Sequence, residues 1–178
     1  MRKTILMPLV SLLVAAIVLL AAYNISLPAR QARIQEELTA KMQTILPGST
    51  TFTQEEYTGE DTNIRSVHKA DNGFVIETAV QGYADEITML VGISKEGKVT
   101  GLVVRKMHET FGLGAHALND HVFLAQFLNT DGDAQVGEGV DAISGATVTS
   151  KAIARSVNSA VAYVTGADIE SGATSWGG

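Results

Sequence analysis

The chain contains no cysteine among its 178 residues. That absence excludes disulfides, thiolate metal sites, iron–sulfur ligation and lipid attachment to an N-terminal cysteine. Basic residues are also few, with 13 Lys and Arg against 19 Asp and Glu, which gives a net charge of −6. Because non-specific nucleic-acid binding depends on clustered basic side chains, we expect no nucleic acid among the partners.

Residues 5–23 form a long apolar run, interrupted only by Pro8 and Ser11 and preceded by Arg2 and Lys3. Its length is close to the roughly 20 residues that cross about 30 Å of hydrocarbon. The run predicts a single-pass anchor over residues 1–27, and its basic flank places the N-terminus in the cytoplasm. The following domain is then expected on the periplasmic or extracellular side of the inner (cell) membrane. A cleaved signal peptide is the alternative, against which stand the long run and a poor cleavage site.

The next segment, residues 28–48, predicts an amphipathic linking helix. We expect it to start after a break at Pro28 and to stop at Pro47-Gly48. Its apolar stripe either buries against the domain or meets a partner helix in a complex. The stripe consists of Ile34, Leu38, Met42 and Ile45.

Two hairpins are predicted next, from β-type runs that flank turn residues. The first joins 64–69 to 74–80 through Asp71-Asn72-Gly73, and the second joins 86–94 to 98–107 through Lys95-Glu96-Gly97. Helices are predicted over 120–128 and 148–164, the longer one with an apolar stripe that includes Ile153 and Val157. This order predicts an α+β fold with a mainly antiparallel sheet and flanking helices. We expect one domain over residues 49–166 and a tail over 167–178.

The most informative residues run from Asp141 to Thr147, with the sequence DAISGAT, followed by Val148-Thr149-Ser150 and the longer helix. Gly145 and Ala146 leave room for a bulky group to approach the Thr147 hydroxyl. The helix start offers free N–H groups and a positive dipole end to an anion. These residues predict a phosphate-group site with a nucleophilic or tethering threonine. Thr149 and Ser150 are expected to be capping hydroxyls at the helix start, and the alternative is a helix-capping loop without ligand.

This Asp-x-x-Ser-Gly-Ala-Thr sequence resembles the flavinylation motif of the FMN-binding domain family, and the resemblance extends over about residues 64–165. It implies that Thr147 carries FMN through a phosphoester bond, installed by a flavin transferase that uses FAD and magnesium. Asp141, Ser144 and Gly145 are then read by the transferase or shape the turn. Ala146, Thr149 and Ser150 complete the cofactor-binding residues expected here.

A second segment also resembles the family, in a loop that lies against the flavin there. It has the sequence ETFGLG over 109–114. The resemblance implies that Glu109, Thr110, Leu113 and Gly114 contact the flavin. Phe111 stands where the family usually has proline, and the family's spacer residue after His108 is missing. The alternative is a glycine-rich connection from strand to helix.

The heptapeptide spacing recurs over 168–174, with Thr174 in the place of Thr147. Only four residues follow Thr174, so no helix start is expected there to meet a phosphate, and Glu170 adds a like charge. We therefore expect the flavin on Thr147. Lys151 and Arg155, one helical turn apart, either offset the remaining phosphodiester charge or are simply solvated.

The sequence predicts neither a metal site nor a catalytic residue for substrate turnover. His108, His116 and His121 lack the i, i+4 spacing of a helical metal site. Asp131 and Asp133 lack the twelve-residue calcium pattern with its closing glutamate.

The resemblance implies an electron-carrying component of a membrane oxidoreductase. The family includes the G subunit of the Rnf complex, which links ferredoxin oxidation, NAD reduction and ion transport, and the C subunit of the sodium-pumping NADH:quinone oxidoreductase. The compact build is more similar to the Rnf G subunit, so the expected partners are the other membrane and redox subunits of an Rnf-type complex. The C subunit of the quinone oxidoreductase, a stand-alone anchored flavoprotein and an anchored scaffold without cofactor are the alternatives.

Overall fold

The computed structural model describes residues 2–106 and 120–167. The chain divides into two compact units, residues 1–40 and 41–178, and each is considered by itself. The boundaries expected at residues 27, 48 and 166 stay predictions.

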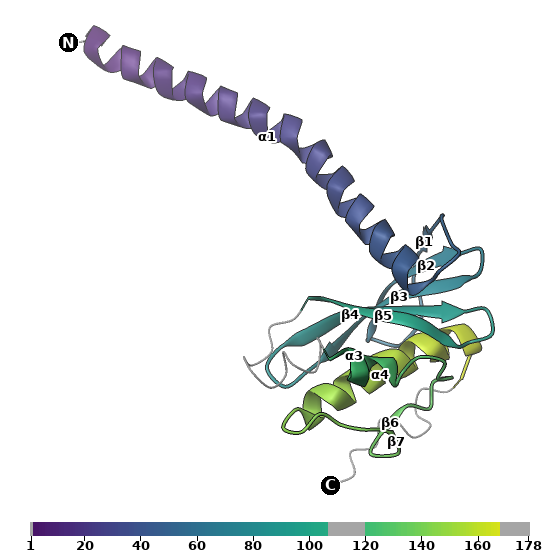
Figure 1. The fold of residues 1–178 in the computed structure, drawn as a ribbon. Helices are drawn as coiled ribbons and strands as arrows, with labels where there is room; N and C mark the ends of the chain where they lie inside the picture. Colours follow the sequence, from purple (N-terminus) through teal and green to yellow (C-terminus); the bar gives the residue numbers. More distant parts are fainter. Residues whose placement is uncertain (1, 107–119, 168–178) are drawn as a thin grey trace. The chain divides into compact units, whose positions relative to one another are not determined.

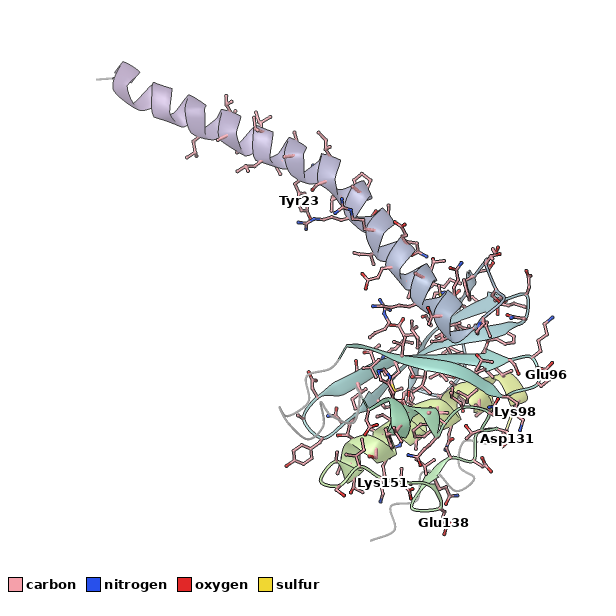
Figure 2. All side chains as sticks on the ribbon, viewed as in Figure 1. Tyr23, Glu96, Lys98, Asp131, Glu138 and Lys151 are labelled. Atoms are coloured by element: carbon pink, nitrogen blue, oxygen red, sulfur yellow. The ribbon has the colours of Figure 1, made fainter. Side chains whose placement is uncertain are left out.

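Helix α1 runs from Arg2 to Ile45. By length and composition it is able to cross a membrane, and its apolar stretch includes Tyr23 (Figure 2). The predicted break at Pro28 is wrong, because the helix continues through this residue. Polar side chains next to the proline bond to backbone carbonyls: Ser26 Oγ donates to Tyr23 O at 2.9 Å, and Asn24 Nδ2 donates to Leu20 O at 2.8 Å.

A five-stranded antiparallel sheet follows in simple chain order (Figure 1). Its first strand, β1, spans only three residues and escaped prediction, because three residues are too few to show alternation. The other four strands confirm the two predicted hairpins. The strands are β1 (Thr53–Glu55), β2 (Ile64–Ala70), β3 (Gly73–Gln81), β4 (Glu86–Ser94) and β5 (Val99–Lys106).

One face of the sheet is covered by α3 (His121–Ala125) and α4 (Thr147–Thr165) (Figure 1). Together with the sheet these helices confirm the α+β fold. The predicted 120–128 helix is shorter than expected, and a small parallel pair, β6 (Gln135–Val136) and β7 (Gly139–Val140), precedes α4. Alternate residues of β3 and β4 form the core with α3 and the predicted stripe of α4. The core includes Ile76, Met89, Val91, Phe127, Ile153 and Val157.

The buried face of α4 also carries polar side chains that find partners. Ser156 shares a hydrogen bond with Thr78 on β3. Asn158 accepts from Ala134 N at 3.2 Å and donates to Ala134 O at 3.0 Å. Because unpaired buried polar groups are costly, these contacts stabilise the packing of the middle of α4.

The opposite face of the sheet receives the last turn of α1, where Met42 and Ile45 are buried. Gly92 on β4 and Gly101 on β5 are paired beneath this turn. A Cβ built on Gly92 would lie 2.5 Å from Ile45 O, so only glycine permits this approach. Thr100 Oγ1 donates to the same carbonyl at 2.6 Å. The stripe predicted to bury is therefore buried at this end, whereas Ile34 is 61% exposed.

A polar network lies on the same face of the sheet, on β2, β3 and β5. Arg105 pairs with Glu77 at 2.6 Å. Ser66 Oγ donates to Glu77 Oε2 at 3.0 Å and lies 3.2 Å from His68 Nε2. Burial lowers the pKa of His68; the nearby Glu77 raises it and Arg105 lowers it further.

Candidate functional site

Helix α4 places Thr147 in its first turn, one residue earlier than predicted, with the side chain exposed. The N-cap residue is Ala146, which makes no side-chain hydrogen bond. The N–H groups of a first helical turn have no intrahelical partner. An exposed hydroxyl therefore stands beside backbone donors that no N-cap side chain covers.

The predicted capping role is wrong for Ser150. The side chains of Thr149 and Ser150 are both buried, at 1% and 0% exposure. Ser150 Oγ accepts from Ile143 N at 3.2 Å and donates to Ala146 O at 3.0 Å. The Ser150 hydroxyl therefore holds the preceding turn from its buried side and does not cap the first turn of α4.

The turn before α4 is built from small residues. Gly145 has φ of +79°, a left-handed conformation that favours glycine. Ala146 N donates to Ile143 O at 2.9 Å, which closes the turn. Ser144 and Gly145 are exposed beside Thr147, whereas Ala146 is buried. The small-residue turn thus exposes Ser144 and Gly145 to solvent, while Ala146 packs into the domain.

The start of the loop is held by Gln126, the C-cap residue of α3. Its Oε1 accepts from Asp141 N at 2.8 Å, and its Nε2 donates to Asp141 O at 3.4 Å. The side chain of Asp141 is exposed. The loop from Asp141 to Ala146 is thus fastened at both ends by side chains from helical segments.

Positive charge follows Thr147 along α4. Lys151 is exposed one turn away, and Arg155 is half-buried two turns away. The Nε atom of Arg155 is buried and has no hydrogen-bond partner within the described ranges 2–106 and 120–167. Figure 2 shows Lys151 at the opposite end of the domain from the Lys98–Asp131 ion pair. These two cations are the positive groups that α4 offers to an anion on Thr147.

The contacts of α4 establish which end of the sheet its first turn occupies. Tyr163, near the end of the helix, packs edge-on against Phe74 at the start of β3, and Ser156 bonds to Thr78 farther along that strand. The first turn therefore lies toward the β3–β4 turn. That turn carries Tyr83, which is 71% exposed. The sheet thus presents an aromatic ring at the same end as the Thr147 hydroxyl.

Several predicted site residues lie outside the described residues. They include Glu109, Thr110, Leu113 and Gly114 of the expected flavin loop, the histidines at 108 and 116, and the second heptapeptide with Thr174. β5 ends at Lys106 opposite Thr88, which is the end of the sheet nearest the β3–β4 turn. Within the ranges 2–106 and 120–167, no group of three His, Asp or Glu side chains is placed to hold a metal ion.

Comparison with known proteins assigns this arrangement to a family. The FMN-binding domain matches residues 82–162. The G subunit of an ion-translocating oxidoreductase complex from Methanosarcina acetivorans is 32% identical over 182 residues, covering 91% of this chain and 95% of its own length. The chain belongs to the G-subunit branch of the FMN-binding domain family.

Two further relatives match over a shorter stretch. The G subunit of the proton-translocating ferredoxin:NAD(+) oxidoreductase complex of Clostridium ljungdahlii is 35% identical over 99 residues, 52% of this chain and 53% of its own length. The G subunit of the Na(+)-translocating ferredoxin:NAD(+) oxidoreductase complex of Acetobacterium woodii is 36% identical over 100 residues, 50% of this chain and 47% of its own length. The chain thus spans about half the length of these two relatives.

The FMN-binding domain match begins at Gly82 and contains the β3–β4 turn, the loop with its fastenings and most of α4. Sequence reasoning missed two residues inside it, Tyr83 and Gln126. Tyr83 had a signal, since an aromatic residue between two strong strand patterns lies at a hairpin tip. Gln126 had none, because its pairing with Asp141 joins residues 15 apart through the packing of α3.

Proposed function

We propose that this chain is the electron-carrying G subunit of a membrane-bound, ion-translocating oxidoreductase of the Rnf type. It carries FMN covalently, through a phosphoester to Thr147. The observation that supports this most is the open first turn of α4, where an exposed hydroxyl stands beside backbone donors on a turn of small residues. A helix start of this kind stabilises a phosphate group.

The residues present fit such a group. A phosphodiester on Thr147 retains one negative charge, and Lys151 supplies an exposed cation one turn away. Gly145 has no side chain to obstruct the approach of a bulky donor, and the restricted χ1 of a β-branched residue gives an attached group a defined direction. In this proposal Ser144 and Asp141 are surface features of the turn, while Ser150 supports it. Tyr83, exposed at the same end of the sheet, would offer an aromatic ring to the bound flavin.

A covalent link suits a domain on the outer side of a membrane. FMN is scarce outside the cytoplasm, so a reversibly bound flavin would be lost by dilution. The tethered flavin supplies one-electron redox chemistry, and the protein supplies attachment and orientation. In this proposal Thr147 accepts the flavin once, during maturation by a flavin transferase, and afterwards serves as an anchor.

The assignment to an Rnf-type complex rests on the relatives. Two of them are named as parts of ferredoxin:NAD(+) oxidoreductases, one proton-translocating and one Na(+)-translocating. We extend to this chain the shared features of those names: electron transfer coupled to ion transport, and partner subunits in a membrane complex. The apolar part of α1 is the proposed anchor, with the FMN-binding domain on the periplasmic or extracellular side.

Peptide mass mapping of protein matured in its native host tests the attachment. The expected result is a fragment spanning residues 141–151 that is heavier by the mass of bound FMN. A denatured and washed sample should still fluoresce as flavin. Recovery of only the bare polypeptide would overturn the proposal and leave an anchored domain without cofactor. Co-purification with multi-span membrane proteins separates a component of a complex from a stand-alone flavoprotein.

A further inference from the structure

We propose that Gln126 is a positioning residue for the modification of Thr147. Its side chain holds the start of the acceptor loop in the geometry that the flavin transferase meets, while Ser150 holds the end of the loop. This inference rests on the proposed function, because it concerns how the flavin reaches Thr147. It assigns a role to a residue outside the heptapeptide.

The contact between Gln126 and Asp141 uses both groups of one side-chain amide. The side-chain carbonyl accepts the backbone N–H of Asp141 at 2.8 Å, and the side-chain NH₂ donates to the backbone carbonyl of the same residue at 3.4 Å. Two bonds to one residue fix its orientation as well as its distance. The backbone of Asp141 is therefore held in a defined orientation at the start of the loop.

Gln126 is itself well placed to act as a fixed point. It follows directly on α3, whose N-terminus is capped by Asp120. The neighbouring rings of Phe123 and Phe127 are buried and pack edge to face, with their centroids 5.3 Å apart. The anchor for Asp141 is thus attached to the hydrophobic core.

The second fastening lies at the other end of the loop. Ser150 is fully buried in α4 and bonds to Ile143 N and Ala146 O. The segment between the two fastenings contains Ser144 and Gly145, both exposed. The loop is therefore held by hydrogen bonds at its two ends, and its exposed residues Ser144 and Gly145 are accessible to the transferase.

The reaction explains why a fixed loop matters. The Thr147 oxygen forms a bond to the FMN phosphorus of FAD, the bond from that phosphorus to the AMP part breaks, AMP leaves, and the hydroxyl proton is released. No electrons are exchanged. The hydroxyl must lie in line with the leaving group, and a misplacement of about 1 Å can slow such a step about 100-fold.

The chain also contains a second copy of the heptapeptide, which lacks the same support in its sequence. The residue three positions after Thr147 is Ser150, whereas the residue three positions after Thr174 is Gly177, which has no hydroxyl. If the fastened loop directs the transferase, the choice between the two threonines depends on Gln126 and Ser150 as well as on the heptapeptide.

The experiment measures the initial rate of FMN incorporation into the full chain by flavin transferase with FAD and Mg²⁺, with peptide mapping of both threonines. Gln126→Met keeps the length of the side chain and removes both hydrogen bonds. We expect incorporation at Thr147 to slow about tenfold, the effect of losing two neutral hydrogen bonds, and the share of label on Thr174 to rise. Gln126→Glu retains the acceptor for Asp141 N but replaces the donor to Asp141 O with a second acceptor, so its rate should lie between those of Gln126→Met and wild type.

Asn158→Leu is the matched control, because Asn158 makes the same two-bond contact with Ala134, outside the acceptor loop. This variant should lower the melting temperature at least as much as Gln126→Met, since Asn158 is more buried, and leave the rate of the folded protein unchanged. Equal rates for Gln126→Met and wild type would overturn the inference. So would equal slowing by both variants, which would indicate a merely structural effect. A wild type that takes no flavin at all would instead overturn the proposed function.

Discussion

The N-termini of α3 and α4 are built in opposite ways. At α3, the carboxylate of Asp120 accepts from Val122 N at 2.9 Å and from Phe123 N at 3.1 Å, so the first donors of the helix are satisfied within the chain. At α4, the N-cap is Ala146, which has no side-chain acceptor. A good N-cap stabilises a helix by about 1 kcal/mol. Of these two helices, α4 is the one whose N-cap side chain supplies no acceptor to the first turn, which in the proposed function leaves that role to an outside anion.

α4 tolerates an open end because its stability comes from elsewhere. Ile153, Val157 and Ala160 are fully buried against the sheet, and polar side chains of the buried face are paired. Tertiary burial of this extent outweighs one missing cap. α3 has only five residues and a single buried one, Phe123, so it depends more on its cap.

Removing the acceptor at the open end should have the largest effect. Thr147→Ala is expected to abolish covalent FMN on the 141–151 segment, because no hydroxyl remains there to form the phosphoester. The free energy of unfolding should change by no more than about 1 kcal/mol, since the side chain is exposed at a helix start. Flavin fluorescence of denatured protein and chemical denaturation measure the two effects.

Two companion variants sharpen this result. Thr147→Ser keeps the hydroxyl and should keep covalent flavin. Thr174→Ala should be silent, because the second heptapeptide is not the expected acceptor. Full flavin retention on Thr147→Ala would move the attachment to another residue.

Removing the cap at the closed end should have a smaller and purely structural effect. Asp120→Ala leaves two backbone donors of α3 without their side-chain partner, and we expect a loss of about 1 kcal/mol in the free energy of unfolding. Thr147 should still take up flavin in the folded protein. Urea titration measures the stability, and an unchanged midpoint would contradict the capping role.

The contrast between the two helices also separates what the sequence allows one to predict from what it does not. The hairpins, the long C-terminal helix and its apolar stripe followed from alternation and helical periodicity. The open end of α4 was predicted in part: the motif placed a hydroxyl at the helix start. Thr149 and Ser150 were interpreted as caps because serine and threonine occur both at helix caps and as buried side chains that bond to a carbonyl of the preceding turn. Only burial distinguishes them.

Other features depended on contacts between distant residues. Nothing in the local sequence indicates that Gln126 pairs with Asp141. The same is true of the packing of Ile45 against Gly92 and Gly101. Pro28 was expected to break the helix, because a proline removes one backbone bond. The helix nevertheless continues through this residue.

The two ends of α4 itself provide a third test. Its C-terminus is closed by Gly166, with φ of +70° and its N–H bonded to Ala162 O at 2.8 Å. Gly166→Ala forces an L side chain into the left-handed region, at a cost of about 1 kcal/mol. Flavin attachment should be unaffected, because the change lies at the end remote from Thr147. Reduced incorporation at Thr147 would mean that the two ends are coupled.

The stability of the fold should depend on pH through His68, which lies on the opposite face of the sheet from α3 and α4. Burial lowers the pKa of this histidine, with Glu77 opposing and Arg105 adding to the shift. Below about pH 6.5 the unfolded chain gains a proton at this residue while the folded chain does not. The free energy of unfolding should therefore fall as the pH drops from about 6.5 to the folded pKa, by at most about 1.4 kcal/mol per pH unit. His68→Gln should remove this part of the slope in urea titrations at pH 7, 6 and 5. If the free energy of unfolding falls with pH equally in both proteins, His68 is not the source of the acid sensitivity.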